Sequence, residues 1–152
     1  MRDTRNKNID IMETTETTSI TVEATINAPI SKVWKAWNDP KDIMQWCAAS
    51  DDWHAPYAEN DLRVDGKFKT TMAAKDGSVS FDFEGVYTNV VPEKAIAYKM
   101  SDGRRVEVFF SRQGDDTKVI ETFDAEKENP LEMQRGGWQA ILDKFKEHVE
   151  NR

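Results

Sequence analysis

Two side chains in this sequence, His54 and Glu121, have the chemistry to move a proton or to bind an oxygenated ligand. The imidazole of a histidine exchanges a proton near neutral pH, so His54 could act as a general base or hydrogen-bond a ligand oxygen. The neighbours Trp53 and Pro56 suggest an alternative, in which the histidine packs at the edge of a strand. We take His54 as a candidate ligand contact and keep this alternative open.

Glu121 lies within a run of alternating apolar residues, between Val119 and Phe123. Because side chains alternate across a β-strand, Glu121 faces the interior if Val119 and Phe123 do. A buried carboxyl group needs a partner or a raised pKa, and such groups often mark functional sites. The competing register places Ile120 and Thr122 inside and Glu121 in water. The alternation favours the interior register, in which Glu121 meets a cationic or hydroxyl group in a cavity.

The sequence gives little support for metal binding or nucleophilic catalysis. Cys47, Asp51, Asp52 and His54 are close in sequence but lack the spacing of a zinc site. Cys47 follows Trp46 and has no basic neighbour, which predicts a buried, inert thiol. The chain has no GxSxG, Walker or GxGxxG motif. We therefore expect no catalytic residue, no metal site and no cofactor, and a binding protein rather than an enzyme.

Two further features are unusual in their local context. Gly136 and Gly137 fall inside a predicted helix, where two glycines cost about 2 kcal/mol relative to alanines. Their missing side chains either leave room for a ligand beneath the helix or allow a close approach to a sheet or a slight bend. Trp46 and Trp53 flank the irregular stretch 48–52, which could cover the mouth of a cavity. The alternative for both indoles is a purely structural place in the core.

A long C-terminal helix and a set of short strands must position these residues. Apolar residues recur at three- and four-residue spacing after Asn129-Pro130, which predicts one amphipathic helix with the stripe Leu131, Trp138, Ile141, Leu142, Phe145 and Val149. Alternating residues predict a first strand at 20–26 and more strands between residues 54 and 124, separated by turns such as Asp76-Gly77. Pro29 and the pair Asp39-Pro40 start two short helices between them. The expected fold is α+β, with a curved antiparallel sheet of about six to seven strands on the C-terminal helix.

Composition limits the partners. A formal net charge of −7 and a pI near 4.9 argue against nucleic acid and against an anionic membrane surface. No apolar run approaches the roughly 20 residues of a membrane span, and the N-terminus lacks the apolar stretch of a signal peptide. We expect a cytoplasmic protein with a disordered tail at residues 1–17 and a single domain at 18–152.

The order of these elements resembles the helix-grip fold of the START and birch-pollen-allergen (SRPBCC) superfamily. Local motifs are most similar to the branch named after activators of the heat-shock protein 90 ATPase. These motifs are Ala28-Pro29 with Val33-Trp34, Trp53-His54-Ala55-Pro56 with Glu59-Asn60-Asp61-Leu62-Arg63, Phe81-Asp82-Phe83-Glu84-Gly85, and Asn129-Pro130 with Gly137-Trp138-Gln139-Ala140-Ile141-Leu142. The resemblance implies a cavity between sheet and helix, which in the superfamily holds lipids, sterols, polyketides or phenolics. Those activators usually carry another domain, for which this chain has no room, so a chaperone is a weaker expectation.

The resulting hypothesis is a pocket that binds a small hydrophobic ligand of the lipid, polyketide or phenolic type. We expect it to be lined by Trp46, Trp53, His54, Met72, Phe81, Phe83, Tyr98, Met100, Phe110, Glu121, Met133, Gly137, Trp138 and Ile141. Two alternatives use the same fold. One is a small cyclase-type or hydrolase-type enzyme in which His54 or Glu121 moves a proton, and the other is a co-chaperone-like interaction module with an exposed apolar patch.

Overall fold

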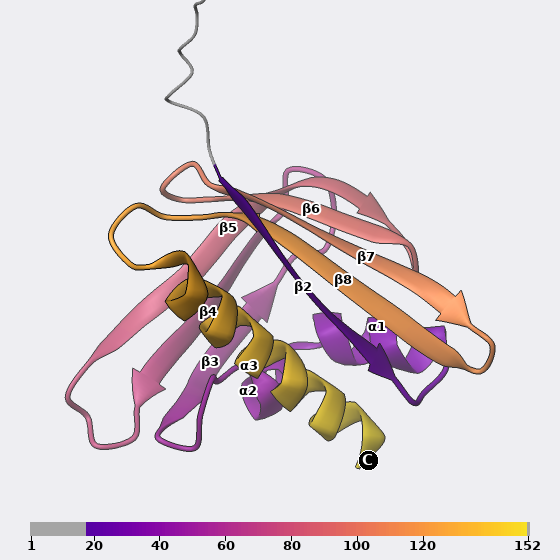
Figure 1. Ribbon diagram of the computed structural model, residues 1–152, viewed down its shortest axis with the longest axis horizontal. Coiled ribbons are helices and arrows are strands. Elements are labelled where there is room, and N and C mark those ends of the chain that lie inside the picture. The colour runs from indigo at the N-terminus through magenta and orange to yellow at the C-terminus, as the bar shows by residue number, and fades with distance from the viewer. Residues whose placement is uncertain (1–17, 152) are drawn as a thin grey trace, which may run out of the picture.

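The structure is a computed structural model that describes residues 18–151, so the tail predicted at 1–17 lies outside the described residues. The chain forms seven strands and three helices over this range. In order they are β2 (Ser19–Ile26), α1 (Ile30–Asn38), α2 (Pro40–Trp46), β3 (Trp53–Asn60), β4 (Lys67–Ala74), β5 (Ser80–Val91), β6 (Ala95–Met100), β7 (Arg105–Gln113), β8 (Asp116–Asp124) and α3 (Leu131–Glu150). This order confirms the predicted fold class (Figure 1). None of the described helices is both long and apolar enough to cross a bilayer.

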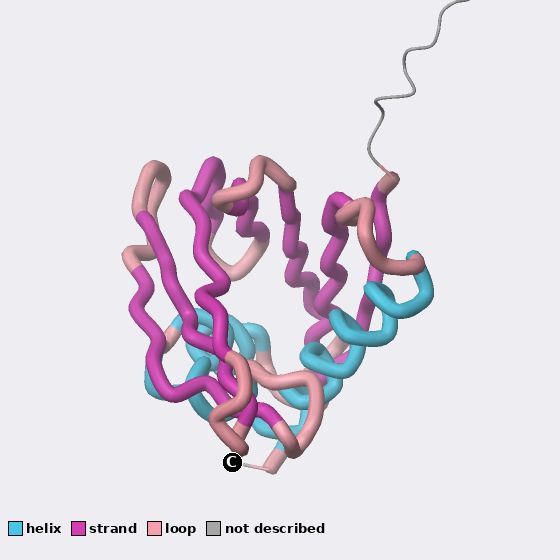
Figure 2. Tube along the Cα trace, turned by 90° about the vertical axis from the view of Figure 1, so that its left-hand side faces the viewer, coloured by secondary structure: helices cyan, strands magenta, loops and turns pink. Residues whose placement is uncertain are grey.

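The seven strands form one antiparallel sheet in the order β2-β8-β7-β6-β5-β4-β3. Strands β3 to β8 form a meander because short turns connect them, and β2 joins this meander by pairing with β8. The sheet curls into a half-barrel, and the helices gather at one end of it (Figure 2). Because alternate side chains point to opposite faces, the curl directs one set of residues from every strand into a shared interior.

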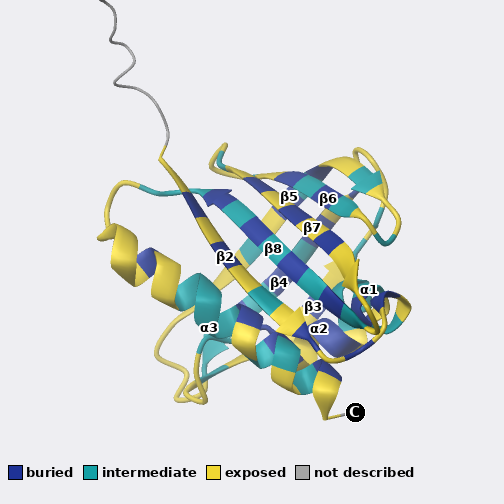
Figure 3. Cartoon of the chain, turned by 45° about the vertical axis from the view of Figure 1, so that its right-hand side comes forward, coloured by how far each residue is buried: buried dark blue, intermediate teal, exposed yellow. Residues whose placement is uncertain are grey.

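Strand β8 shows this alternation most clearly (Figure 3). Its buried residues are Thr117, Val119, Glu121 and Phe123, and its other residues are only half-buried. The interior register predicted for Glu121 is therefore confirmed. On the opposite side of the sheet, Thr122 pairs by its hydroxyl with Thr21 at 2.9 Å.

The two short helices form where proline and a side-chain cap predict them. Asp39 caps α2 by accepting a hydrogen bond from the Lys41 backbone N–H at 3.0 Å, with Pro40 in the first turn. Trp46, at the end of α2, donates its indole N–H to the Ala36 carbonyl of α1 at 2.9 Å. The two helices are thus held against each other by a buried hydrogen bond.

Helix α3 has two unequal halves. Its second half buries Leu142, Phe145 and Val149, and the Phe145 ring contacts Trp37 of α1 with ring centres 4.8 Å apart. Its first turns are exposed (Figure 3), and Leu131 at the start of the predicted apolar stripe is 45% exposed. The described part of α3 lies along β2, with its second half also against α1 and α2.

Gln134 holds the exposed start of α3. Its amide accepts a hydrogen bond from the Glu126 N–H at 2.9 Å and donates to the Asn129 carbonyl at 2.8 Å. Pro130, the N-cap residue, makes no side-chain capping bond. Gln134 therefore ties the helix to the loop that precedes it, although no apolar side chain of this half is buried.

The two adjacent glycines of α3 are not required for close packing of the helix against the sheet. A Cβ atom at either Gly136 or Gly137 would meet nothing within 4 Å. Of the alternatives raised by the sequence, tight packing on the sheet is therefore excluded at both positions.

We predict that Gly136→Ala stabilises the protein, because alanine has the higher helix propensity and its Cβ meets open space. The free energy of unfolding in urea should rise by about 1 kcal/mol. Gly85→Ala is the contrasting variant, since its Cβ would lie 2.8 Å from the Lys99 carbonyl oxygen and 2.9 Å from the Phe68 ring. That variant should be destabilised, and a loss of stability in Gly136→Ala would contradict the open space around the helix.

Candidate functional site

A pocket of about 380 Å³ opens into the half-barrel between the inner faces of β4, β5 and β6, the end of α2, and the middle of α3. Eight of its lining residues are aromatic, namely Trp37, Trp46, Phe68, Phe81, Phe83, Tyr87, Tyr98 and Trp138. Its volume falls within the 300–1,000 Å³ usual for small-molecule sites. The site therefore has the size and the wall of a pocket for a small apolar molecule.

Trp138 and Ile141 are the two α3 residues that line this pocket. The Trp138 ring stacks on Phe123 of β8, with ring centres 3.9 Å apart and planes at 10°. Phe83 of β5 meets Trp138 edge-on, with centres 6.0 Å apart. The helix thus connects the two sides of the curled sheet through one indole, and the pocket lies beside this contact.

Glu121 is the most unusual residue of the lining. It is 6% exposed, and no hydrogen bond or ion pair joins its carboxyl group to another residue of 18–151. Burial away from water raises its pKa from 4.5 to about 8, because nothing nearby stabilises the negative charge. At neutral pH the side chain is therefore a neutral carboxylic acid in the wall of an apolar pocket.

Two other protonated groups lie near Glu121. Burial, and secondarily the charge of Glu121, raise the pKa of the Cys47 thiol to about 12. Burial likewise raises the pKa of Tyr98 well above 10, with Glu121 as the next contribution. Both residues line the pocket and stay neutral at physiological pH. Cys47 is therefore an inert thiol, as its sequence context predicts, and lacks the thiolate that a nucleophile needs.

A chain of hydrogen bonds crosses the wall near α1. The Tyr87 hydroxyl donates to Asn60 Oδ1 at 2.5 Å, the Asn60 amide donates to the Asn38 carbonyl at 2.8 Å, and the Asn38 amide donates to the Trp34 carbonyl at 3.0 Å. This arrangement leaves Asn38 Oδ1 buried without a partner among the described residues. Asn38 thus holds a buried acceptor behind the pocket lining that no described residue satisfies.

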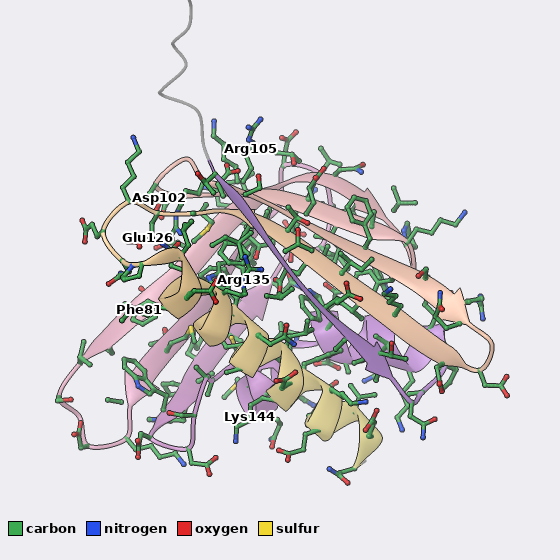
Figure 4. All side chains as sticks on the ribbon, viewed as in Figure 1. Phe81, Asp102, Arg105, Glu126, Arg135 and Lys144 are labelled. Atoms are coloured by element: carbon green, nitrogen blue, oxygen red, sulfur yellow. The ribbon has the colours of Figure 1, made fainter. Side chains whose placement is uncertain are left out.

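Charged residues surround the opening. Asp102 and Arg104, in the turn between β6 and β7, form an ion pair at 2.8 Å. Asp82 and Glu84 of β5 belong to the lining as well, and both are exposed. In Figure 4, Asp102 and Phe81 lie toward the end of the molecule where α3 begins.

The structure brings together nine of the residues proposed from sequence. Those that line the pocket are Trp46, Met72, Phe81, Phe83, Tyr98, Met100, Glu121, Trp138 and Ile141. Five others do not line it, namely Trp53, His54, Phe110, Met133 and Gly137. Of the two polar contacts predicted from sequence, Glu121 lines the pocket and His54 does not.

His54 lies away from the pocket because β3 turns it outward. Ala55 and Ala58 are the buried residues of this edge strand, and His54 is exposed. The pairing of β3 with β4 shifts between His54 and Tyr57, so simple alternation does not hold there. Trp53 is half-buried and meets Phe81 with ring centres 5.9 Å apart, just outside the lining.

Phe110, Met133 and Gly137 are displaced for other reasons. Phe110 is buried under α1, with its ring centre 5.2 Å from that of Trp34. Met133 is 62% exposed in the first turn of α3. Gly137 has no side chain to reach the pocket that its neighbour Trp138 lines.

Sequence reasoning missed several lining residues, including Trp37, Asn38, Phe68, Thr70, Tyr87 and Arg104. Phe68 and Thr70 share the alternation of Met72 on β4, so parity alone could have found them. Asn38 and Arg104 gave no such signal, because they lie at a helix end and in a turn. No group of three or more His, Cys, Asp or Glu residues in the described range is placed to hold a metal ion.

Comparison with known proteins shows what the chain is similar to. Residues 27–150 match the family model described as Activator of Hsp90 ATPase homolog 1-like protein. The solution structure of an AHSA1-like protein from Aeromonas hydrophila is 48% identical with a TM-score of 0.83, covering 88% of this chain and 93% of that one. A solution structure from Cytophaga hutchinsonii is 56% identical with a TM-score of 0.77, covering 88% and 92%.

A more distant crystal structure, from Chromobacterium violaceum, shares the fold alone. It is 22% identical with a TM-score of 0.78, and the match covers 87% of this chain and 96% of that one. None of the curated proteins compared with the chain matches it.

The buried acid predicts a specific pH dependence of stability. Between pH 4.5 and about 8, Glu121 holds a proton in the folded protein but not in the unfolded chain. Unfolding then releases a proton, so Glu121 makes the free energy of unfolding fall as pH rises, by up to about 1.4 kcal/mol per pH unit. Glu121→Gln has no proton to lose and should gain stability relative to wild type across this window.

Urea unfolding of both proteins at several pH values measures this difference. Glu107→Gln, the same change at an exposed carboxylate on β7, is the control and should show no such trend. A stability difference between Glu121→Gln and wild type that stays constant with pH would show that Glu121 titrates normally.

Proposed function

The chain belongs to the Activator of Hsp90 ATPase homolog 1-like protein family, and from this premise we propose that it binds a small hydrophobic or aromatic molecule in the pocket beside α3. The observation that carries the proposal is Glu121, a buried carboxyl group in an apolar wall with no partner in the described chain. A buried polar group without a hydrogen bond costs roughly 1–3 kcal/mol. A bound ligand with a polar group would offset that cost.

The shape of the pocket supports the same function. The apolar wall supplies most of the contact, as in known small-molecule sites, and the carboxyl group of Glu121 would orient the ligand. Met72 and Met100 also belong to the lining, and their flexible side chains can adapt to an irregular ligand.

Catalysis is the second candidate, and one observation favours it. Glu121 is protonated at neutral pH, as a general acid must be. His54, the other proposed proton carrier, lies outside the pocket, and the neighbouring Cys47 and Tyr98 have pKa values raised far above neutral. A single acid without a base is better suited to orient a ligand than to complete a reaction cycle.

The family description names activation of the Hsp90 ATPase, and we do not extend that activity to this chain. Glu121 and the pocket that it lines lie in the interior of the half-barrel, whereas docking on a chaperone needs an exposed apolar face.

We predict that the purified protein is stabilised thermally by some members of a panel of lipids, flavonoids and polyketide-like aromatics, and that the same compounds quench its tryptophan fluorescence. Ile141→Trp should abolish both responses, because the larger ring would occupy space next to Trp138 in the pocket. Ile120→Trp makes the same change on the outer face of β8 and should leave binding within about twofold of wild type. If no compound of the panel stabilises the wild-type protein or quenches its fluorescence, the proposed function is contradicted.

A further inference from the structure

The charges around the pocket are almost all negative. Four exposed carboxylates belong to its lining, from Glu59, Asp82, Glu84 and Asp102, whereas Glu121 is neutral at neutral pH. Arg104 is the single basic residue of that lining, and its guanidinium already pairs with Asp102 at 2.8 Å. Like-charge repulsion therefore works against an anionic ligand such as a fatty acid, and the field at the opening attracts a cation.

The buried carboxyl group of Glu121 in the pocket lining calls for a hydrogen-bond donor. The carboxyl group of Glu121 accepts through both oxygens once it is ionised. A ligand with several N–H donors would satisfy both carboxylate oxygens, whereas an ether or ketone would satisfy neither in that state.

The aromatic wall suits the same chemistry. Phe83 meets Tyr98 and Trp138 edge-on in the lining that also contains Glu121, with ring centres 6.1 Å apart at 85° and 6.0 Å apart at 78°. An ammonium group over an aromatic face is attracted by the ring's quadrupole, more strongly where water is excluded. Aromatic rings and a carboxyl group together are a recognition site for an organic cation.

We propose that the ligand of this pocket is a small organic amine with an apolar body, whose ammonium group donates to Glu121. This inference rests on the proposed function and narrows it to one ligand class. The apolar body would lie against the aromatic wall, and the acidic residues at the opening would favour entry of the cation.

Binding of an amine removes the proton of Glu121, and this proton release distinguishes an amine from a neutral ligand. Glu121 is protonated in the free protein at neutral pH, so pairing with an ammonium group expels about one proton per molecule bound. Its neighbours Cys47 and Tyr98 remain neutral, since burial raises both of their pKa values far above 8, and Arg104 remains charged. Amine affinity should rise with pH up to about 8, whereas an alcohol that accepts a hydrogen bond from protonated Glu121 should lose affinity above about 8.

Three probes with the same aromatic body test the inference, namely naphthylmethylamine, naphthylmethanol and naphthoic acid. We expect the amine to bind most tightly and the acid most weakly, by isothermal titration at neutral pH. Titration of the amine in two buffers with different ionisation enthalpies should report release of about one proton. Glu121→Gln should weaken the affinity for the amine by about tenfold or more and change the affinity for the alcohol by less than about threefold. Only the amine loses a charged hydrogen bond in this variant.

The control is Glu107→Gln, which removes an equal charge from the exposed face of β7 and should leave all three affinities unchanged. Preference for the alcohol or the acid, or amine binding without proton release, would overturn the amine proposal while leaving ligand binding intact. Failure of all three probes would also overturn it, and the broad panel with the Ile141→Trp variant then decides separately whether the pocket binds any ligand.

Discussion

The contact of Phe145 with Trp37 and Trp46 fixes the position of α3, and the pocket depends on that position. The three rings meet edge-on or tilted, with centres 4.8 to 5.1 Å apart, and Phe145 is fully buried. Aromatic contacts of this kind contribute roughly 0.5–1.5 kcal/mol each beyond the area they bury. The first half of α3 is held to the sheet by Trp138, which stacks on Phe123, and by hydrogen bonds from Arg135 and Gln139 to carbonyls of β2. The pocket lies beside Trp138.

Glu121 shows how that space affects the energetics of the fold. A leucine at this position would complete the apolar face formed by Val119 and Phe123, yet the chain places a carboxyl group there at a cost in desolvation. The core below it is dense, since Val119, Phe123 and Phe145 are all buried to 1% or less exposure. An unsatisfied group in an otherwise well-packed interior is the kind of local inconsistency that marks a functional site.

Much of the fold could be predicted from sequence because its signals are local. Alternation in residues 117–123 placed Glu121 correctly, and Pro29 and Asp39-Pro40 marked both short helices. His54 lies outside the pocket because a register shift in β3 interrupts the alternation on which its predicted placement depended. Met133 lies outside it because a helical stripe shows which residues share a face, and cannot show how far along the helix that face remains covered.

The sequence by itself determined the order of strands and helices, the side of β8 on which Glu121 lies, and the aromatic character of the interior, because periodicity and turn chemistry act over a few residues. Only the tertiary structure decided that Asn38 and Arg104 join the lining, that His54 does not, and that Glu121 has no partner in the described chain. These facts depend on the curl of the sheet and on where α3 is held. Both arise from contacts between residues as far apart as Trp37 and Phe145, which no local pattern encodes.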